Sequence, residues 1–261
     1  MRRNLDGKSM VDQAIAILRT YEPPEGYYLA FSGGKDSVVL YRLAQMAGVR
    51  FDAHYSVCPD PPELMRFIKR EYPAVAWDRP EHTLYWYIER KGFPTRRRRW
   101  CCELFKEAGG RGRVVLTGIR AAESPARQRR GTVEWCYRHR DKLYVNPILG
   151  WSTGEVWEFI RSQGLPYCHL YDEGWHRLGC VPCPFERKVE RSMGRWPRIW
   201  ENCRRAFRRG WERCGENGHH GFRESHRRFE SADAVFEWWC SRDRPYPAPL
   251  DEEDEQPALF V

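Results

Sequence analysis

The stretch from Tyr27 to Gly48 restricts the fold of this chain more than any other. An apolar run, Tyr27 to Phe31, stops at the hexapeptide SGGKDS (residues 32–37), and an amphipathic helical pattern begins directly after it. A glycine-rich turn between a buried strand and a helix points several backbone N–H groups at one spot, where the helix dipole also favours negative charge. The junction therefore predicts a phosphate-binding loop that leaves a parallel strand and enters a helix.

Each residue of the hexapeptide has a use in such a loop. The glycines permit close backbone approach and unusual φ angles, the lysine supplies a point charge, and the serines offer hydroxyl groups. The aspartate can cap the helix or help to hold Mg²⁺. We expect all six residues to bind the ligand, and the lysine and aspartate to be catalytic and exposed: Ser32, Gly33, Gly34, Lys35, Asp36 and Ser37. The spacing is not that of the P-loop G-x-x-x-x-G-K-[ST].

Strand-like and helix-like segments alternate after this loop. Ser9 can cap a helix that precedes it, Gly48 can end the helix that follows it, and Ser152-Thr153-Gly154-Glu155 forms a capping box that opens another helix. Further strands are expected at residues 51–57, 114–118 and 143–148. Strands separated by helices predict an α/β fold with a parallel sheet and helices on both faces.

After Pro184 the pattern is helical only. It includes an aromatic stripe that we interpret as core packing, with a platform for stacking bases as the alternative: Trp196, Trp200, Cys203, Phe207 and Trp211. The expected organisation is a nucleotide-binding domain with the metal-ligating cysteines at 1–185, a basic helical region at 186–245, and a loose acidic tail at 246–261.

Net charge and cysteine content limit the partners and the compartment. The chain carries a formal charge of +8 with arginines in runs, and residues 186–230 hold 13 Lys and Arg against 7 Glu, so a polyanion such as nucleic acid is an expected partner. We find no signal peptide and no apolar stretch of membrane-spanning length, so the protein should be soluble and cytoplasmic, with no membrane partner. Ten cysteines in a reduced compartment predict metal binding rather than a disulfide framework.

Four of these cysteines have spacings that suit one metal centre. Cys180 and Cys183 form a C-x-x-C pair, and the adjacent Cys101 and Cys102 can supply two more thiolates. Four thiolates suit one Zn²⁺ or one [4Fe–4S] cluster, and adjacent cysteines are unusual in structural zinc sites. The remaining cysteines lack a paired spacing and are expected to be small buried residues: Cys58, Cys136, Cys168, Cys203, Cys214 and Cys240.

Several segments together resemble a known family. SGGKDS resembles the pyrophosphate loop of the N-type ATP pyrophosphatases, the adenine nucleotide alpha hydrolase-like, Rossmann-like superfamily that includes phosphoadenosine phosphosulfate (PAPS) reductases. Four later segments resemble that family in the right order: RWCCELFKEAG, GIRAAESPAR, NPILGWSTGEVWEFI and RLGCVPCPF. The doubled cysteine is similar to that of the iron–sulfur adenylylsulfate (APS) reductases, which implies a [4Fe–4S] cluster.

The resemblance implies roles for further residues. Lys106 and Arg120 match catalytic positions, and Gly118, Arg120 and Arg127 match positions that bind the nucleotide, which would be ATP, APS or PAPS with Mg²⁺. We expect Arg120 and Arg127 on one face of one helix, with Glu123 orienting one of them. The run Arg96 to Arg99 is a solvated surface or the entrance to the site.

Other charged residues receive no catalytic role. His54, His139 and His169 have no partner that the sequence identifies, so we expect them to be structural.

The resemblance leaves the reaction open. One use of this fold splits ATP into an adenylyl intermediate and pyrophosphate for sulfur insertion, as in thiouridine synthases and DndC-type proteins of DNA phosphorothioation. The other reduces APS or PAPS to sulfite through a cysteine in a C-terminal E-C-G-L-H, with thioredoxin as partner. That motif is absent here, and Cys240 is the nearest candidate.

We therefore favour ATP-dependent sulfur transfer to nucleic acid, with a cysteine desulfurase as sulfur donor. The alternatives are an APS or PAPS reductase and a non-catalytic nucleotide-binding module.

Overall fold

The computed structural model describes residues 9–95, 97–136, 141–183, 185–186, 188–217, 221–241 and 246–247. The chain forms two compact units, of which the first comprises residues 1–80 and 105–179 and the second comprises residues 81–104 and 180–261. Residues 81–104 thus group with the C-terminal helices. Nearly all of the expected acidic tail lies outside the described residues.

The first unit is built on a six-stranded sheet with strand order β3-β2-β1-β4-β6-β5. Its strands are β1 (Tyr27–Ala30), β2 (Phe51–Ser56), β3 (Ala76–Asp78), β4 (Val114–Leu116), β5 (Val133–Trp135) and β6 (Leu143–Val145). Neighbouring strands are parallel except β5 and β6, which are antiparallel. The predicted α/β class with a mainly parallel sheet is confirmed.

The sequence does not predict β3 or β5. Each has three residues, none of them buried, whereas the equally short β4 and β6 contain buried residues and belong to apolar runs that could be recognised. Trp135 in β5 is 65% exposed, so burial does not mark this strand either. Pairing with β6, in which Glu134 lies opposite Tyr144, holds β5 in place.

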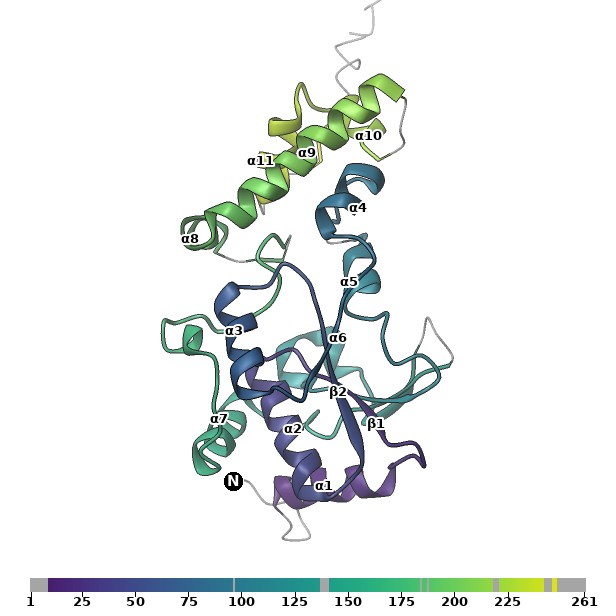
Figure 1. The fold of residues 1–261 in the computed structure, drawn as a ribbon, viewed down its shortest axis with the longest axis vertical. Helices are drawn as coiled ribbons and strands as arrows, with labels where there is room; N and C mark the ends of the chain where they lie inside the picture. Colours follow the sequence, from purple (N-terminus) through teal and green to yellow (C-terminus); the bar gives the residue numbers. More distant parts are fainter. Residues whose placement is uncertain are drawn as a thin grey trace, which may run out of the picture. The chain divides into compact units, whose positions relative to one another are not determined.

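Helix α2 lies at the centre of the first unit's helical layer and begins at the SGGKDS loop. It packs against both α1 and α7 (Figure 1). The helices of this unit are α1 (Met10–Thr20), α2 (Lys35–Ala47), α3 (Pro62–Glu71), η1 (Ala121–Glu123), α6 (Pro125–Gln128), α7 (Thr153–Ser162) and η2 (His169–Tyr171), where η denotes a 3₁₀ helix.

The predicted helix ends are present. Ser9 and Ser152 each form a complete capping box, and Gly48 ends α2 in the left-handed conformation with φ of 70°. A serine cap stabilises a helix by about 1 kcal/mol, so local sequence alone sets where α1 and α7 begin.

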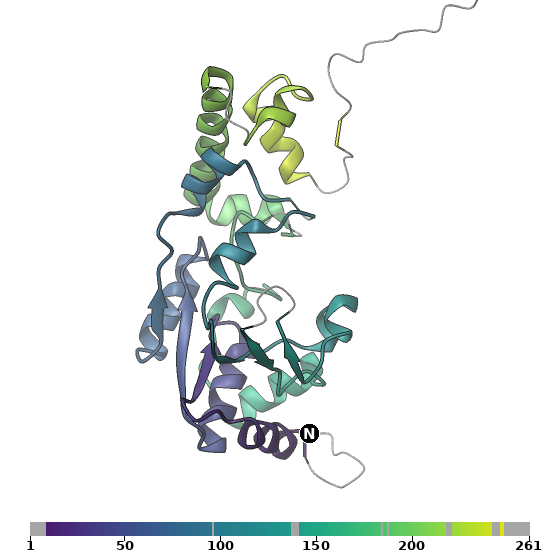
Figure 2. The same cartoon turned by 90° about the vertical axis from the view of Figure 1, so that its right-hand side faces the viewer.

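The second unit is helical. Its helices are α4 (Leu84–Lys91), α5 (Trp100–Phe105), whose last residue belongs to the first unit, α8 (Val189–Arg195), α9 (Pro197–Asn217), α10 (Arg223–His226) and α11 (Ala232–Cys240). Helix α9 contacts α4, α8, α10 and α11, and Figures 1 and 2 show α11 alongside it.

The aromatic stripe of α8 and α9 forms the core of this unit, as expected. Trp196, Trp200, Cys203 and Phe207 are buried, while Trp211 stacks on His226 with ring centroids 3.7 Å apart. Because the rings are occupied by core contacts, they do not form an exposed platform for bases. Among the described helices, none is long and apolar enough to cross a membrane.

Tyr27 ties α1 to the start of β1. Its side chain is fully buried, and its hydroxyl donates a hydrogen bond of 2.8 Å to the carbonyl of Leu18 in α1. Burial, with a contribution from Glu22, raises the pKa of Tyr27 above its usual value of 10.0. The folded protein therefore keeps this proton at a pH where the unfolded chain releases it. Deprotonation then favours the unfolded chain, so the free energy of unfolding falls as the pH rises past the usual tyrosine pKa.

We expect Tyr27→Phe to lower the free energy of unfolding by about 1 kcal/mol at about pH 8, because a buried carbonyl loses its donor. The deficit should shrink at about pH 10.5, since the variant lacks the tyrosine ionisation that favours unfolding. Urea unfolding at both pH values measures this, with Tyr21→Phe as a control that removes an exposed hydroxyl. A deficit that is constant or larger at high pH would contradict the assignment.

Candidate functional site

The SGGKDS loop lies at the carboxyl end of β1 and is held by its own side chains. The Ser37 hydroxyl donates to the carbonyl of Gly34 at 2.9 Å, and the Ser32 N–H donates to the Ser37 hydroxyl at 3.2 Å. Gly34 is the N-cap of α2 and carries no capping side chain, so the first turn of α2 begins with backbone N–H groups. This is the arrangement that binds phosphate oxygens at a helix N-terminus.

Gly33 allows the loop to pass close to α3. Its φ is 69°, in the left-handed region, and a Cβ at this position would lie 2.6 Å from side-chain atoms of Ile68. Both the conformation and the space therefore require glycine.

Lys35 is buried rather than exposed, which corrects the expectation from sequence. Lys35 is the first residue of α2, and its ammonium group lies 2.9 Å from Asp36 Oδ2. Its backbone N–H donates to the hydroxyl of Tyr171 at 3.0 Å, although 135 residues lie between them in the sequence. No local pattern in the sequence could have identified Tyr171 as part of the loop's surroundings.

Arg120 joins three elements at this site. The residue is 2% exposed, and its Nε donates to Asp36 Oδ1 at 2.6 Å. Its Nη1 donates to the carbonyl of Trp151 at 3.2 Å and to the hydroxyl of Thr153 at 3.3 Å. The guanidinium group therefore fixes the Asp36 carboxylate and links α2 to the start of α7.

Gly118 lets the chain leaving β4 approach α2 closely. A Cβ there would lie 3.0 Å from the backbone carbonyl group of Asp36. The structure thus brings Gly118 and Arg120, both expected from the motifs, to the same turn of α2 as Lys35 and Asp36.

Arg120 and Arg127 do not lie on one helix, contrary to expectation. Arg120 precedes η1, Arg127 lies in α6, and Ser124 between them is extended with φ of −170° and caps α6. Glu123 joins the two segments. Its Oε2 accepts a hydrogen bond of 2.9 Å from the backbone N–H of Arg120 and another from Nη1 of Arg127. Glu123 therefore orients Arg127, as its predicted role requires.

Lys106 lies just after α5, and the turn that follows it is held by a buried lysine. Lys142 is fully buried and donates to the carbonyls of Glu107 at 2.5 Å and Gly109 at 2.6 Å. Burial lowers the pKa of Lys142. The Lys106 ammonium group lies beside Gly179, 3.8 Å from where a Cβ of that glycine would be.

A pocket opens beside Lys35, between α7 and the segment that contains η2. Its volume is about 300 Å³, and its lining includes Trp157, Arg161, Tyr167 and Tyr171. The family motifs include Trp157 within a longer segment but identify no pocket there.

His54 has carboxylate partners, which corrects the expectation that it has none. Its Nδ1 lies 3.0 Å from Asp78 Oδ1 and its Nε2 lies 2.5 Å from Asp52 Oδ2. Hydrogen bonds from Arg113 lower the pKa of Asp52. His169 also has a partner, Glu173 at 3.4 Å. His139 lies outside the described residues.

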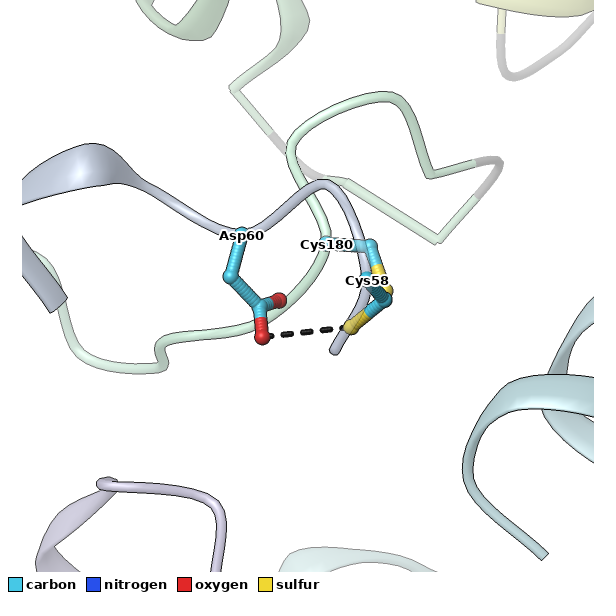
Figure 3. A group of neighbouring side chains, drawn as sticks. All are labelled: Cys58, Asp60 and Cys180. Atoms are coloured by element: carbon cyan, nitrogen blue, oxygen red, sulfur yellow. Dashed lines mark hydrogen bonds between the residues drawn. The ribbon is translucent and has the colours of Figure 1, made fainter. Parts of the chain in front are cut away.

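Cys58 is buried, as expected, but it also takes part in a polar contact. Its thiol donates to Asp60 Oδ2 at 3.1 Å (Figure 3), and the Tyr55 hydroxyl donates to the same oxygen at 2.8 Å. Asp60 is 5% exposed and follows β2 at the carboxyl edge of the sheet. The sequence gives no signal for this aspartate, because it belongs to none of the recognised motifs.

The four expected metal ligands all belong to the second unit. Cys101 and Cys102 lie on α5, and Cys180 and Cys183 lie in the loop before α8. The pKa of the Cys101 thiol is raised, first by its hydrogen bond with Cys102, then by burial and by the charges of the other three cysteines. The other three cysteines therefore act electrostatically on Cys101, and four thiolates are the donor set of a Zn²⁺ or [4Fe–4S] centre.

Arg99 contacts this cysteine group. Its Nη2 donates to Cys102 Sγ at 3.2 Å, and its guanidinium group lies 4.8 Å from the ring centroid of Phe185. Of the predicted arginine run, Arg97 and Arg98 are exposed, and Arg96 lies outside the described residues.

The remaining cysteines are buried or half-buried. Cys136, Cys168, Cys203 and Cys214 are buried. Cys240 is half-buried on α11, and burial is the main cause that raises its pKa to about 12. A thiol with this environment is a poor nucleophile at neutral pH.

Several arginines of the basic region at 186–230, which was expected to contact nucleic acid, form ion pairs within the second unit. Arg204 and Arg208 both pair with Asp233, at 3.6 and 2.9 Å. The other paired arginines of this set are Arg205 with Glu201, Arg209 with Glu89 and Arg228 with Glu224. These charges are partly neutralised, so the net charge of this region overstates the positive charge that is free to bind a phosphate backbone.

Comparisons with known proteins agree with the motifs. Residues 26–186 match the phosphoadenosine phosphosulfate reductase domain. Adenosine 5′-phosphosulfate reductase of Staphylococcus epidermidis is 30% identical to this chain over 200 residues, which cover 68% of this chain and 78% of that protein. The enzyme of the same name from Allochromatium vinosum is 35% identical over 112 residues, or 40% of this chain and 43% of that protein.

Among solved structures, phosphoadenylyl-sulfate (PAPS) reductase from Candida auris in its phosphate complex is 17% identical to this chain. The match has a TM-score of 0.49 and covers 69% of this chain and 97% of that one.

We expect Asp36→Asn to destabilise the protein by about 2–4 kcal/mol, because it leaves the buried Arg120 without its carboxylate. This revises the expectation that a change at Asp36 affects chemistry alone. Arg120→Met should lower the free energy of unfolding by a similar amount. The double variant should lower it by less than the sum of the two single effects, with a coupling energy of at least about 1 kcal/mol. Urea unfolding measures each term, and Glu25→Gln is the control for loss of an exposed carboxylate. Strict additivity would refute the linkage.

Proposed function

Because this chain belongs to the phosphoadenosine phosphosulfate reductase domain family, as its motifs predicted, we propose that it is an enzyme that binds ATP with Mg²⁺ at the SGGKDS loop. The reaction is adenylyl transfer to an acceptor. An oxygen of the acceptor forms a bond to the α-phosphorus while the bond between that phosphorus and the α–β bridging oxygen breaks, and pyrophosphate leaves. Bound Mg²⁺ supplies charge neutralisation for the departing pyrophosphate.

The residues around the loop have distinct tasks in this reaction. The N-terminus of α2 and the Lys35 ammonium group stabilise the phosphate oxygens. Asp36 would provide an oxygen ligand for Mg²⁺, and Arg120 is a positioning residue that fixes that carboxylate. Lys106 supplies a second positive charge for the nucleotide, by its match to the family motif. Arg127 and Gly118 complete the nucleotide site proposed from the motifs.

One observation carries the choice of adenylyl transfer over reduction, namely the setting of Cys240. A reductase of this family needs a nucleophilic thiol that can move into the site. Cys240 is half-buried on a helix, and burial is the main cause that raises its pKa to about 12. Cys203, its neighbour in the second unit, is fully buried with its pKa raised by burial.

We also propose that Cys101, Cys102, Cys180 and Cys183 hold a [4Fe–4S] cluster, supported by the chemistry of four thiolates and by the electrostatic interaction of Cys101 with the other three. When bound, the cluster supplies a site for handling sulfur or electrons. Arg99 lies against Cys102 Sγ and is suited to stabilise the negative charge of a thiolate ligand.

Nucleic acid is the acceptor class that we propose. The terminal sulfur of a donor persulfide attacks the acceptor atom that bears the adenylylated oxygen, the bond from that atom to the oxygen breaks, and AMP leaves with the oxygen. A thiol then cleaves the S–S bond and leaves the sulfur on the acceptor. The positive net charge supports this class. Because arginines of α9 are in ion pairs, we expect nucleic acid to bind weakly and to dissociate as salt is added. A sulfur-donor protein such as a cysteine desulfurase is the matching partner.

Reduction of APS or PAPS to sulfite, with thioredoxin as reductant, is the second candidate. The observation that favours it is the 30% identity to a protein named as an adenosine 5′-phosphosulfate reductase. In this case Cys240 would attack the sulfate sulfur, and its burial would have to be relieved first.

Protein purified without oxygen should be brown and contain about four iron atoms per chain. We expect Cys183→Ser to lose most of the iron and the visible absorbance, because a cluster ligand is removed. Cys214→Ser is the matched control and should keep both, since Cys214 is a buried residue outside the ligand set. Stoichiometric zinc without iron in the anaerobic protein would refute the cluster assignment.

The wild-type protein should cleave ATP to AMP and pyrophosphate when an acceptor is present, and Lys35→Ala should lower this rate at least about 100-fold because phosphate stabilisation is lost. Cys240→Ser should leave the rate unchanged. Chromatography of labelled nucleotide and a sulfite assay with APS or PAPS and a thiol donor measure the two reactions in parallel. Sulfite formation that Cys240→Ser abolishes, without ATP cleavage, would establish the reductase instead.

A further inference from the structure

The pocket beside Lys35 has one wall of aromatic rings. Trp157 projects from α7, and its ring meets those of Tyr167 and Tyr171 edge to face, with centroids 5.1 Å apart in both cases. Edge-to-face clusters of this kind leave ring surfaces on which a planar ligand can stack. The wall is therefore suited to a flat aromatic group.

The rings of this wall are fixed before any ligand binds. The Tyr171 hydroxyl accepts the backbone N–H of Lys35 at 3.0 Å, and the Tyr167 hydroxyl donates to Asp172 Oδ1 at 3.0 Å. A wall held in place loses little conformational entropy on binding. The contact with Lys35 also places the wall directly beside the phosphate loop.

Positive groups line the same pocket. Arg161 lies one turn after Trp157 on α7 and is exposed, and the Lys35 ammonium group lies 5.9 Å from the Tyr171 ring centroid. The carboxylate in the lining, Asp172, already accepts the Tyr167 hydroxyl. An anionic group can therefore bind at Arg161 while an aromatic ring lies on the wall.

The volume limits what can enter. The pocket measures about 300 Å³, at the lower end of the roughly 300–1,000 Å³ typical of ligand sites. That space suits one ring with its charged substituent and is small for a complete nucleoside triphosphate. The pocket and the phosphate loop therefore suit two different ligands that meet at Lys35.

We propose that this pocket binds the acceptor as a single nucleotide unit, with its base on the Trp157 wall and its phosphate at Arg161. The inference rests on the proposed function and names the acceptor subsite. Enzymes that act on a base within a strand take it out of the stack and read it in such an aromatic pocket. The ligand chemistry is a nucleobase with one phosphate, which either a free mononucleotide or a strand can supply.

The probe is 2-aminopurine, whose fluorescence falls when it stacks on an aromatic ring. It is supplied in two forms: the riboside 5′-monophosphate, and a single-stranded trinucleotide with 2-aminopurine at its centre. Each is titrated into the full-length protein in the presence of α,β-methylene-ATP, whose own binding is measured by calorimetry.

We expect saturable quenching, with the trinucleotide binding more tightly if the source is a strand. Arg161→Gln should weaken the probe at least about tenfold, a loss of one charged contact, and should leave the Kd of α,β-methylene-ATP within about twofold. Trp157→Leu should abolish quenching. Arg50→Gln, which removes an exposed arginine elsewhere in the first unit, is the matched control and should change neither measurement.

The inference is overturned if Arg161→Gln weakens α,β-methylene-ATP as much as the probe, because the pocket would then belong to the ATP site. It is also overturned if neither Arg161→Gln nor Trp157→Leu changes the response of the probe. Because Trp157→Leu can perturb folding, its circular dichroism spectrum is compared with that of the wild type. If the two spectra differ, only the result for Arg161→Gln is used to judge the proposal. Absence of α,β-methylene-ATP binding in the wild type would instead refute the proposed function, and Arg161-dependent binding of the probe alone would still support the pocket.

Discussion

The ion pair between Arg120 and Asp36 is the interaction on which the geometry of the first unit's site depends. A buried guanidinium group requires a carboxylate and further acceptors, and Arg120 finds them in α2, in the carbonyl of Trp151 and in the hydroxyl of Thr153. The first turn of α2 is thereby held to the chain leaving β4 and to the start of α7. Phosphate recognition at a helix N-terminus needs this rigidity, because its backbone donors act by their position.

Features that rest on neighbours in the sequence were predictable. The SGGKDS loop, the capping boxes at Ser9 and Ser152 and the terminating Gly48 each depend on a few adjacent residues, and the structure contains all of them. The strands β1, β2, β4 and β6 and the helices α1, α2 and α7 followed from the same local patterns. Short strands such as β5 escaped because pairing with β6, rather than their own composition, makes them strands.

Contacts between distant segments were not predictable from one sequence. Tyr171 reaches Lys35 from η2, Lys142 holds the turn after Lys106, and His54 lies between two aspartates from β2 and β3. In each case the residue type is ordinary and only the fold creates the partner. For the arginine-rich region the sequence suggested more free charge than the structure has. A count of charges does not show that arginines of α9 pair with Asp233 and Glu89. The break between η1 and α6 comes from Ser124, which is extended and caps α6. The proline that follows it disfavours a helical Ser124, a local signal that the expectation of one helix overlooked.

The hydrogen bond from the Lys35 N–H to the Tyr171 hydroxyl lies between the two ligand sites that we propose, the phosphate loop and the aromatic pocket, and would couple them thermodynamically. A phosphate oxygen that accepts this N–H competes with the phenol for one donor, so nucleotide binding and the placement of Tyr171 share a single free-energy balance. Linkage of this kind is reciprocal: whatever the nucleotide does to the affinity of the neighbouring pocket, an occupant of that pocket does to the affinity for the nucleotide by the same factor. A single backbone donor thus couples the affinities of the two proposed sites without any movement of a domain, and because the coupling is reciprocal it favours neither order of addition.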